Sequence, residues 1–390
     1  RSLREQVSTK LQLVLAAGSP ARRESPEAVA EIEKQIKHSS KADLVERVAY
    51  TWFNRFCALR FMDVNRYTPI GIVSPLPGQF QPEILAEAKM GHIDESMVPE
   101  ARRRQVEALL NGTAPSRDPQ GEAYRLLVVS VCNYYQGPMP YLFEKIADYT
   151  ELLMPDDLLS GNSILAYTRE AMTPDVCKDV EVLGWLYQFY VSERKDEVFE
   201  SMRKGKKIAP EDVSATTQLF TPHWIVAFLL DNSLGRLWML NRPRSRLIER
   251  MRYYLRPIQE LPDFVRVASP EELRVGDSAV GAAHMLTYAF DLLYAIYEEE
   301  GYNPPDIPRL ILEKNLYGME IDERAAALAA FALTMKAREV DRRFLTRGVV
   351  PNICNLHSVG FTDRELVTIS WLRRLGENLA DLSARDALLH

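Results

Sequence analysis

Apolar positions recur at helical spacing through the first 200 residues of the chain. The clearest case is residues 44–62, where large apolar side chains follow a period of about 3.6 residues. These side chains are Val45, Val48, Ala49, Trp52, Phe53, Phe56 and Leu59. Segments rich in turn-forming residues at 18–20, 69–78 and 111–121 interrupt the pattern and predict loops. The pattern therefore predicts an all-helical N-terminal domain.

A second helical block, residues 180–198, leads into a short basic segment at residues 202–207. We place a domain boundary there, which gives a helical domain over residues 1–207 and a second domain over residues 208–390. Two interpretations of the basic segment stay open, because such runs occur both as ordinary solvated surface and as hinges that contact phosphate groups.

The pattern changes after Arg274. A short apolar segment at Val275 is followed by a turn of small residues at 278–283 and by an amphipathic helix at 285–300. A strand at 316–321, an alanine-rich helix at 324–340 and a further strand edge at 351–356 come next. This alternation predicts the α/β class, with a parallel, Rossmann-like sheet and crossover helices over residues 208–390.

Composition narrows the class of protein. Hydrophobic residues make up 46% and charged residues 26% of the chain, as in ordinary globular proteins, and the net charge is −6. DNA binding would therefore depend on local basic patches, of which residues 102–104, 204–207 and 242–252 are candidates. The four cysteines form no CxxC pair, so we expect no metal site and a reducing cytoplasm. No stretch is apolar enough to predict a membrane helix or a signal peptide.

Three segments carry candidate chemistry. Thr221 and Pro222 precede an apolar helix, as N-cap and first-turn residues do. The small residues between Asp277 and His284 join a strand to a helix, where a backbone can approach a ligand closely. Glu320 ends the next strand, where a carboxylate can accept ribose hydroxyls, and Ile321 could lie against an adenine face. We expect Asp322 to cap the helix that follows.

Together these segments resemble the cofactor half of amino-group DNA methyltransferases, and the PglX proteins of bacterial BREX phage-exclusion systems are a closer match. The strings that carry this resemblance are AYTWFNR at 49–55, GWLYQFY at 184–190, ATTQLFTP at 215–222 and NLYGMEID at 315–322. The resemblance spans about residues 44–355. It identifies the chain as the N-terminal and cofactor-binding part of a longer protein.

The resemblance implies an S-adenosylmethionine-dependent enzyme that methylates the N6 amine of adenine in double-stranded DNA, after flipping the base. It also implies other BREX proteins, and phage-encoded DNA mimics, as partners. Thr221 would flank the methionine part of the cofactor, Asp277 and Gly281 belong to the glycine-rich turn, and Glu320 would hold the ribose. The predicted cofactor-binding residues are Phe220, Thr221, Pro222, Asp277, Ala279, Gly281, His284, Glu320 and Ile321.

Two departures from the family pattern bear on activity. The family turn reads Asp-Pro-Ala-Cys-Gly-Ser-Gly-His, whereas this chain has Ser278, Val280, Ala282 and Ala283 at the second, fourth, sixth and seventh positions. Ala283 places a methyl group where the backbone should approach the cofactor or adopt a positive φ. We therefore predict weakened cofactor affinity.

The second departure is the catalytic Asn-Pro-Pro-Tyr/Phe loop. The only Asn-Pro-Pro here begins at Asn303, precedes the Glu320 strand and is followed by Asp306 rather than an aromatic residue. We expect the true loop beyond residue 390, so no catalytic residue is predicted and this chain alone should be inactive. The alternatives are a DNA-binding or assembly subunit that has lost cofactor binding and, against the helical strings, a small-molecule methyltransferase.

Overall fold

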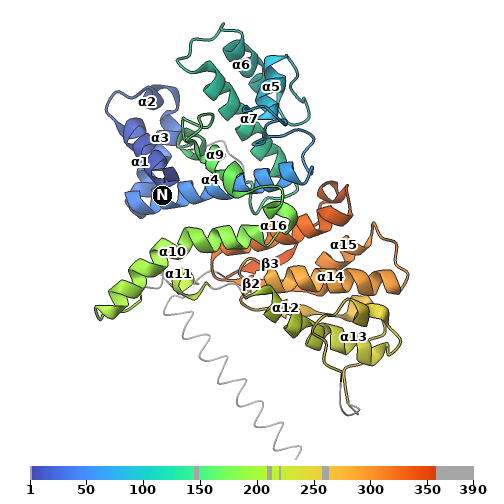
Figure 1. Ribbon diagram of the computed structural model, residues 1–390. Coiled ribbons are helices and arrows are strands. Elements are labelled where there is room, and N and C mark those ends of the chain that lie inside the picture. The colour runs from blue at the N-terminus through green and yellow to red at the C-terminus, as the bar shows by residue number, and fades with distance from the viewer. Residues whose placement is uncertain (1, 145–148, 209–212, 219–220, 257–262, 357–390) are drawn as a thin grey trace, which may run out of the picture. The chain divides into compact units, whose positions relative to one another are not determined.

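The computed structural model describes residues 2–144, 149–208, 213–218, 221–256 and 263–356 (Figure 1). Its first part is helical. The helices are α1 (Ser2–Leu15), α2 (Pro20–Glu24), α3 (Pro26–His38), α4 (Lys41–Val64), α5 (Glu83–Lys89), α6 (Glu100–Leu110), α7 (Pro119–Tyr135), α8 (Tyr149–Leu152), α9 (Ile164–Ala171) and α10 (Val182–Arg203). The helices predicted at residues 44–62 and 180–198 correspond to α4 and α10, so both predictions are confirmed.

The second part alternates helices with strands. Its elements are α11 (Val213–Thr217), α12 (His223–Leu230), α13 (Arg236–Asn241), β1 (Val275–Asp277), α14 (His284–Glu299), α15 (Ile307–Leu310), β2 (Leu316–Glu320), α16 (Glu323–Val340) and β3 (Asn352–Asn355). Single π-helical turns follow α12 (Asp231–Gly235) and α15 (Ile311–Asn315). Among the described residues, no helix is both long enough and apolar enough to cross a membrane.

The three strands form one sheet in the order β1, β2, β3, and both pairs are parallel. The predicted parallel pairing is confirmed, and the chain belongs to the α/β class. The alternation along β2 buries Leu316, Gly318 and Glu320, whereas Tyr317 and Met319 are exposed. Helices α14 and α16 both contact β2. A three-stranded sheet does not by itself establish the Rossmann-like methyltransferase fold, which stays a prediction.

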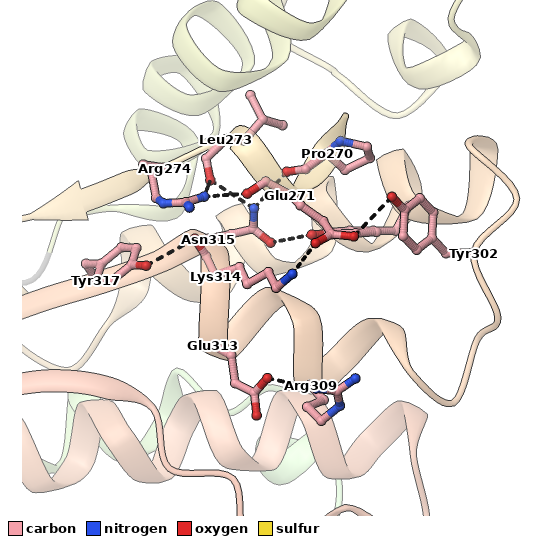
Figure 2. Close-up of polar contacts among 11 residues, drawn as sticks. Pro270, Glu271, Leu273, Arg274, Tyr302, Arg309, Glu313, Lys314, Asn315 and Tyr317 are labelled. Atoms are coloured by element: carbon pink, nitrogen blue, oxygen red, sulfur yellow. Dashed lines mark hydrogen bonds and ion pairs between the residues drawn. The ribbon is translucent and has the colours of Figure 1, made fainter. Parts of the chain in front are cut away.

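A buried polar network fixes the amino ends of β1 and β2 (Figure 2). Asn315, fully buried just before β2, donates its side-chain amide to the carbonyl oxygens of Pro270 and Leu273 at 2.8 and 2.9 Å. Its amide oxygen accepts the hydroxyl of Tyr297 at 2.9 Å. Nearby, Lys314 pairs with Glu271, which also accepts the Tyr302 hydroxyl. One asparagine therefore ties the segment before β1 to the start of β2.

Two apolar cores meet at α16. The helical core is built mainly from α1, α4, α7 and α10, and the sheet core from α12, α14, β2 and the segments around them. On α16, Ala325, Leu328 and Phe331 belong to the helical core, whereas Leu333 and Ala337 belong to the sheet core. Small alanine side chains let both cores approach this helix closely. The domain boundary at residue 207 stays a prediction.

Candidate functional site

The turn after β1 is held by backbone hydrogen bonds at the carboxyl end of the sheet. The Asp277 carboxylate accepts the Ala279 amide at 3.1 Å, and the Val280 amide donates to the carbonyl oxygen of Met319 in β2 at 2.9 Å. The Ala283 amide returns to the Val280 carbonyl at 2.8 Å. These bonds bring the small-residue turn against the end of the neighbouring strand.

Two residues of this turn have left-handed backbone conformations. Gly281 has φ +54° and Ala283 has φ +69°, and Ala283 is the N-cap residue of α14. For an alanine this conformation costs about 1–2 kcal/mol, because Cβ approaches the carbonyl oxygen. The positive φ expected at position 283 is therefore confirmed. Its effect on cofactor affinity stays a prediction.

The Glu320 carboxylate joins the end of β2 to the turn. It is buried and accepts the backbone amides of Gly281 at 2.8 Å, Ile321 at 2.9 Å and Asp322 at 3.0 Å. A carboxylate has about four lone-pair sites, so about one remains for a ligand. Glu320 can therefore accept a hydrogen bond from one further hydroxyl group. A second hydroxyl would have to replace one of the three backbone amides.

Asp322 caps α16, as predicted. Its carboxylate accepts the amides of Arg324 at 2.9 Å and Ala325 at 3.2 Å, which are orphan donors of the first helical turn. Its other oxygen accepts the hydroxyl of Tyr187 in α10 at 2.8 Å. The ring of Tyr187 lies edge-on to Tyr50 of α4, with centroids 5.4 Å apart. Three of the strings that carry the family resemblance thus meet at this point.

The expectation that Thr221 caps α12 was wrong. The helix begins at His223, Pro222 is its N-cap residue, and no side chain of the described residues caps it. Pro222 has ψ 141°, an extended conformation that leaves Thr221 one residue outside the helix. The threonine lines a cavity instead. Phe220, a predicted cofactor-binding residue, lies outside the described residues.

One cavity of about 220 Å³ collects most of the predicted site. Its lining includes the predicted residues Thr221, Asp277, Ala279, Gly281, His284, Glu320 and Ile321. Pro222 is described but is not among the lining residues. Thr217, Gln218 and Met285 also line the cavity, and the sequence analysis did not select them. Gln218 could have been suspected because it belongs to the ATTQLFTP string.

Two side chains set the polarity of the cavity. Gln218 is buried, and in the described part of the chain its Oε1 has no hydrogen-bond partner. Such an orphan acceptor is suited to a ligand that brings an O–H or N–H donor. Burial lowers the pKa of His284 below its ordinary value, although the nearby Glu181 carboxylate raises it in part. The imidazole is therefore neutral at pH 7. At the rim, Ile321 is 54% exposed and offers an apolar surface.

Most arginines in two of the three candidate basic patches pair with nearby carboxylates. Arg102, Arg103 and Arg104 each pair with a glutamate, at Glu151, Glu95 and Glu100. In the third patch the pairs are Arg242 with Glu300, Arg246 with Glu249 and Arg250 with Glu298. These pairs favour the ordinary-surface interpretation for the patches at 102–104 and 242–252.

Comparisons with known proteins identify the family. No family model matches the chain. It is 43% identical over 332 residues to the adenine-specific methyltransferase BrxX of Escherichia coli O9:H4 (strain HS), a match that covers 83% of this chain. It is also 35% identical over 334 residues to the adenine-specific methyltransferase PglX of Lacticaseibacillus casei (strain Zhang), covering 81% of this chain. The chain belongs to the PglX-type adenine-specific methyltransferases.

The chain spans only part of the family's length, because each of these matches covers 27% of the relative. The solved structure of the ATP-dependent Type ISP restriction-modification enzyme LlaBIII bound to DNA is 13% identical, with a TM-score of 0.27. That match covers 93% of this chain and 22% of the enzyme. A TM-score this low supports no conclusion about the fold or the ligand of the PglX-type chain.

Proposed function

We propose that this chain is the cofactor-binding part of an S-adenosylmethionine-dependent DNA adenine-N6 methyltransferase that marks host DNA in a BREX phage-exclusion system. The observation that carries the proposal is the cavity at the carboxyl end of the sheet, which collects Thr221, Asp277, Gly281 and Glu320. Open parallel sheets bind ligands at this end of their strands. The family of the chain provides independent support.

The described residues fit such a cofactor in three respects. Glu320 retains about one acceptor site for a ribose hydroxyl. Gln218 supplies a buried acceptor without a partner among the described residues, and the exposed Ile321 provides an apolar surface for a purine ring. When bound, the cofactor would supply the methyl group, while these residues bind and orient it.

The target would be adenine in double-stranded DNA, extruded from the duplex so that its exocyclic amine becomes accessible. The Asn-Pro-Pro at residues 303–305 is followed by Asp306 and not by an aromatic residue that could stack on such a base, so we assign no catalytic residue in this chain. A cytoplasmic location, other BREX proteins and phage DNA mimics as partners belong to the same proposal and rest on the family.

Two observations favour a second function. Ala283 occupies a left-handed position, and Glu320 already accepts three amides, so cofactor affinity could be too low for use in the cell. The chain would then be a DNA-binding or assembly subunit of the defence complex, without methyltransferase activity.

Calorimetric titration separates the two functions. S-adenosylmethionine is titrated into the chain and into a variant with the family turn, Ser278→Pro, Val280→Cys, Ala282→Ser and Ala283→Gly. The enzyme proposal expects binding to the unaltered chain, with higher affinity in the restored turn. Binding only to the restored turn would indicate the cofactor-free subunit, and binding to neither would refute the assigned site. Salt-dependent affinity for duplex DNA, measured alongside, tests the DNA partner.

A further inference from the structure

Helix α10 approaches the turn after β1 at a distance that only glycine permits. A Cβ atom added at Gly184 would lie 2.6 Å from Nε2 of His284 and 2.9 Å from Cβ of Ala282. Carbon atoms in van der Waals contact lie about 3.5–4.0 Å apart, so a methyl group at position 184 would force the turn or the helix to move.

The groups that a methyl would meet are enclosed. His284 is 4% exposed, and the Trp185 ring lies 5.7 Å from the imidazole, centroid to centroid. Ala282 is buried in the helical core, whereas the next residue, Ala283, belongs to the sheet core. The turn therefore passes from one core to the other beside Gly184.

The same helix touches the second wall of the cavity. One helical turn after Gly184, the Tyr187 hydroxyl donates to the Asp322 carboxylate at 2.8 Å. Asp322 in turn donates its backbone amide to Glu320. Thus α10 contacts the loop that follows β1 and the loop that follows β2, and both loops line the cavity.

We propose that α10 positions both loops of the cofactor cavity, with Gly184 as the positioning residue that sets the distance between the helix and the turn. Gly184 contacts no ligand in this proposal, because it acts through His284 and Ala282. The effect on cofactor affinity rests on the proposed function, whereas the effect on the turn does not.

The first test is Gly184→Ala, measured by hydrogen–deuterium exchange and by titration of S-adenosylmethionine. Alanine is a better helix former than glycine, so a loss of cofactor affinity in this variant cannot come from a lower helix propensity of α10. We expect faster amide exchange in residues 279–287, with unchanged exchange in α4 and α7, and about tenfold weaker cofactor binding from overpacking. Gly161→Ala, in a turn, is the control, because no atom of the described residues that are not its chain neighbours lies within 4 Å of a Cβ there.

A rescue distinguishes positioning from general damage. In a background with Ala282→Gly and His284→Ala, both contacting groups are gone. Gly184→Ala should there change cofactor affinity less than about threefold relative to that background. An equal loss in both backgrounds, or unchanged exchange in residues 279–287, overturns the proposal.

Two further outcomes of these experiments also decide whether α10 positions the loops. If the unaltered chain and the restored turn bind no S-adenosylmethionine, the proposed function fails and the exchange data alone decide the positioning role. If Gly184→Ala raises exchange throughout the chain, that variant is generally unfolded and Tyr187→Phe becomes the test variant. Tyr187→Phe removes only the hydroxyl group that donates to Asp322. Faster exchange confined to residues 320–325 then supports the proposal, and unchanged exchange there refutes it.

Discussion

The two ends of the three-stranded sheet satisfy their polar groups in opposite ways. At the amino end, the Asn315 side chain donates two hydrogen bonds and accepts one, all within the protein (Figure 2). At the carboxyl end, Ala283 holds a left-handed conformation and the buried Gln218 Oε1 lacks a partner among the described residues. The amino end is therefore complete without a ligand, whereas the carboxyl end is not.

The two ends of the sheet should therefore contribute differently to the stability of the fold and to ligand binding. A buried network whose donors and acceptors are all paired stabilises the fold. Backbone strain and orphan acceptors cost free energy, and they persist where a ligand is bound. Changes at the amino end should therefore lower the free energy of unfolding and spare ligand affinity, whereas changes at the carboxyl end should lower ligand affinity.

The largest effect on stability is expected from Asn315→Ala. The change leaves the carbonyl oxygens of Pro270 and Leu273 without their buried donor and the Tyr297 hydroxyl without its acceptor. We expect the free energy of unfolding to fall by about 3 kcal/mol, measured by urea denaturation. Asn303→Ala, which removes only an exposed bond to Asp306, is the control and should change it little. Weaker binding of S-adenosylmethionine by the folded Asn315→Ala variant would contradict the comparison.

The next effect is expected from Glu320→Ala at the opposite end. Three amides lose their acceptor, and the cavity loses its carboxylate. We expect S-adenosylmethionine affinity to fall about 100-fold in calorimetry, because a charge-assisted hydrogen bond and the shape of the turn are lost together. Asp322→Ala, which removes the helix cap but keeps Glu320, serves as the control and should weaken binding less. Equal losses of affinity in Glu320→Ala and Asp322→Ala would contradict the role assigned to Glu320.

Ala283 provides a matched pair with its neighbour. Ala283→Gly and Ala282→Gly each remove one buried methyl group, but only position 283 has a positive φ. Relief of the left-handed strain should make Ala283→Gly more stable than Ala282→Gly by about 1 kcal/mol in thermal unfolding. If the two variants unfold at the same temperature, the strain assigned to Ala283 is absent.

The smallest effect is expected from Gln218→Met, which replaces the amide with an apolar side chain of similar length. Because Oε1 has no protein partner in the described structure, stability should stay within about 0.5 kcal/mol. Cofactor affinity should fall about fivefold, the value of one neutral hydrogen bond. Unchanged affinity would show that the ligand does not use this acceptor.

Periodicity predicted the secondary structure well where the apolar pattern was long. Helices α4, α10, α14 and α16 and strand β2 lie within about three residues of their predicted bounds at most ends, because each buries a continuous apolar face. The C-terminus of α10 extends further, to Arg203, because Glu200, Met202 and Arg203 are good helix formers that continue the helix beyond residue 198.

Contacts between residues far apart in the chain were harder to predict from the sequence. The motif strings selected residues that the fold gathers around one cavity, but they could not show that Pro222 takes the N-cap position from Thr221. Nor could they show that Gly184 faces His284, because that contact joins residues 100 positions apart in the chain. Likewise, only the folded structure shows that Gln218 Oε1 has no hydrogen-bond partner in the part of the chain that it describes.

The measurement that tests the central claim most directly is hydrogen–deuterium exchange of the chain with and without saturating S-adenosylmethionine. We expect slower exchange in residues 277–285 and 318–322, at the carboxyl ends of β1 and β2, and no change in residues 270–275 and 313–316 at their amino ends. Protection at the amino ends, or no protection at either end, would contradict the assignment of the cavity as the cofactor site.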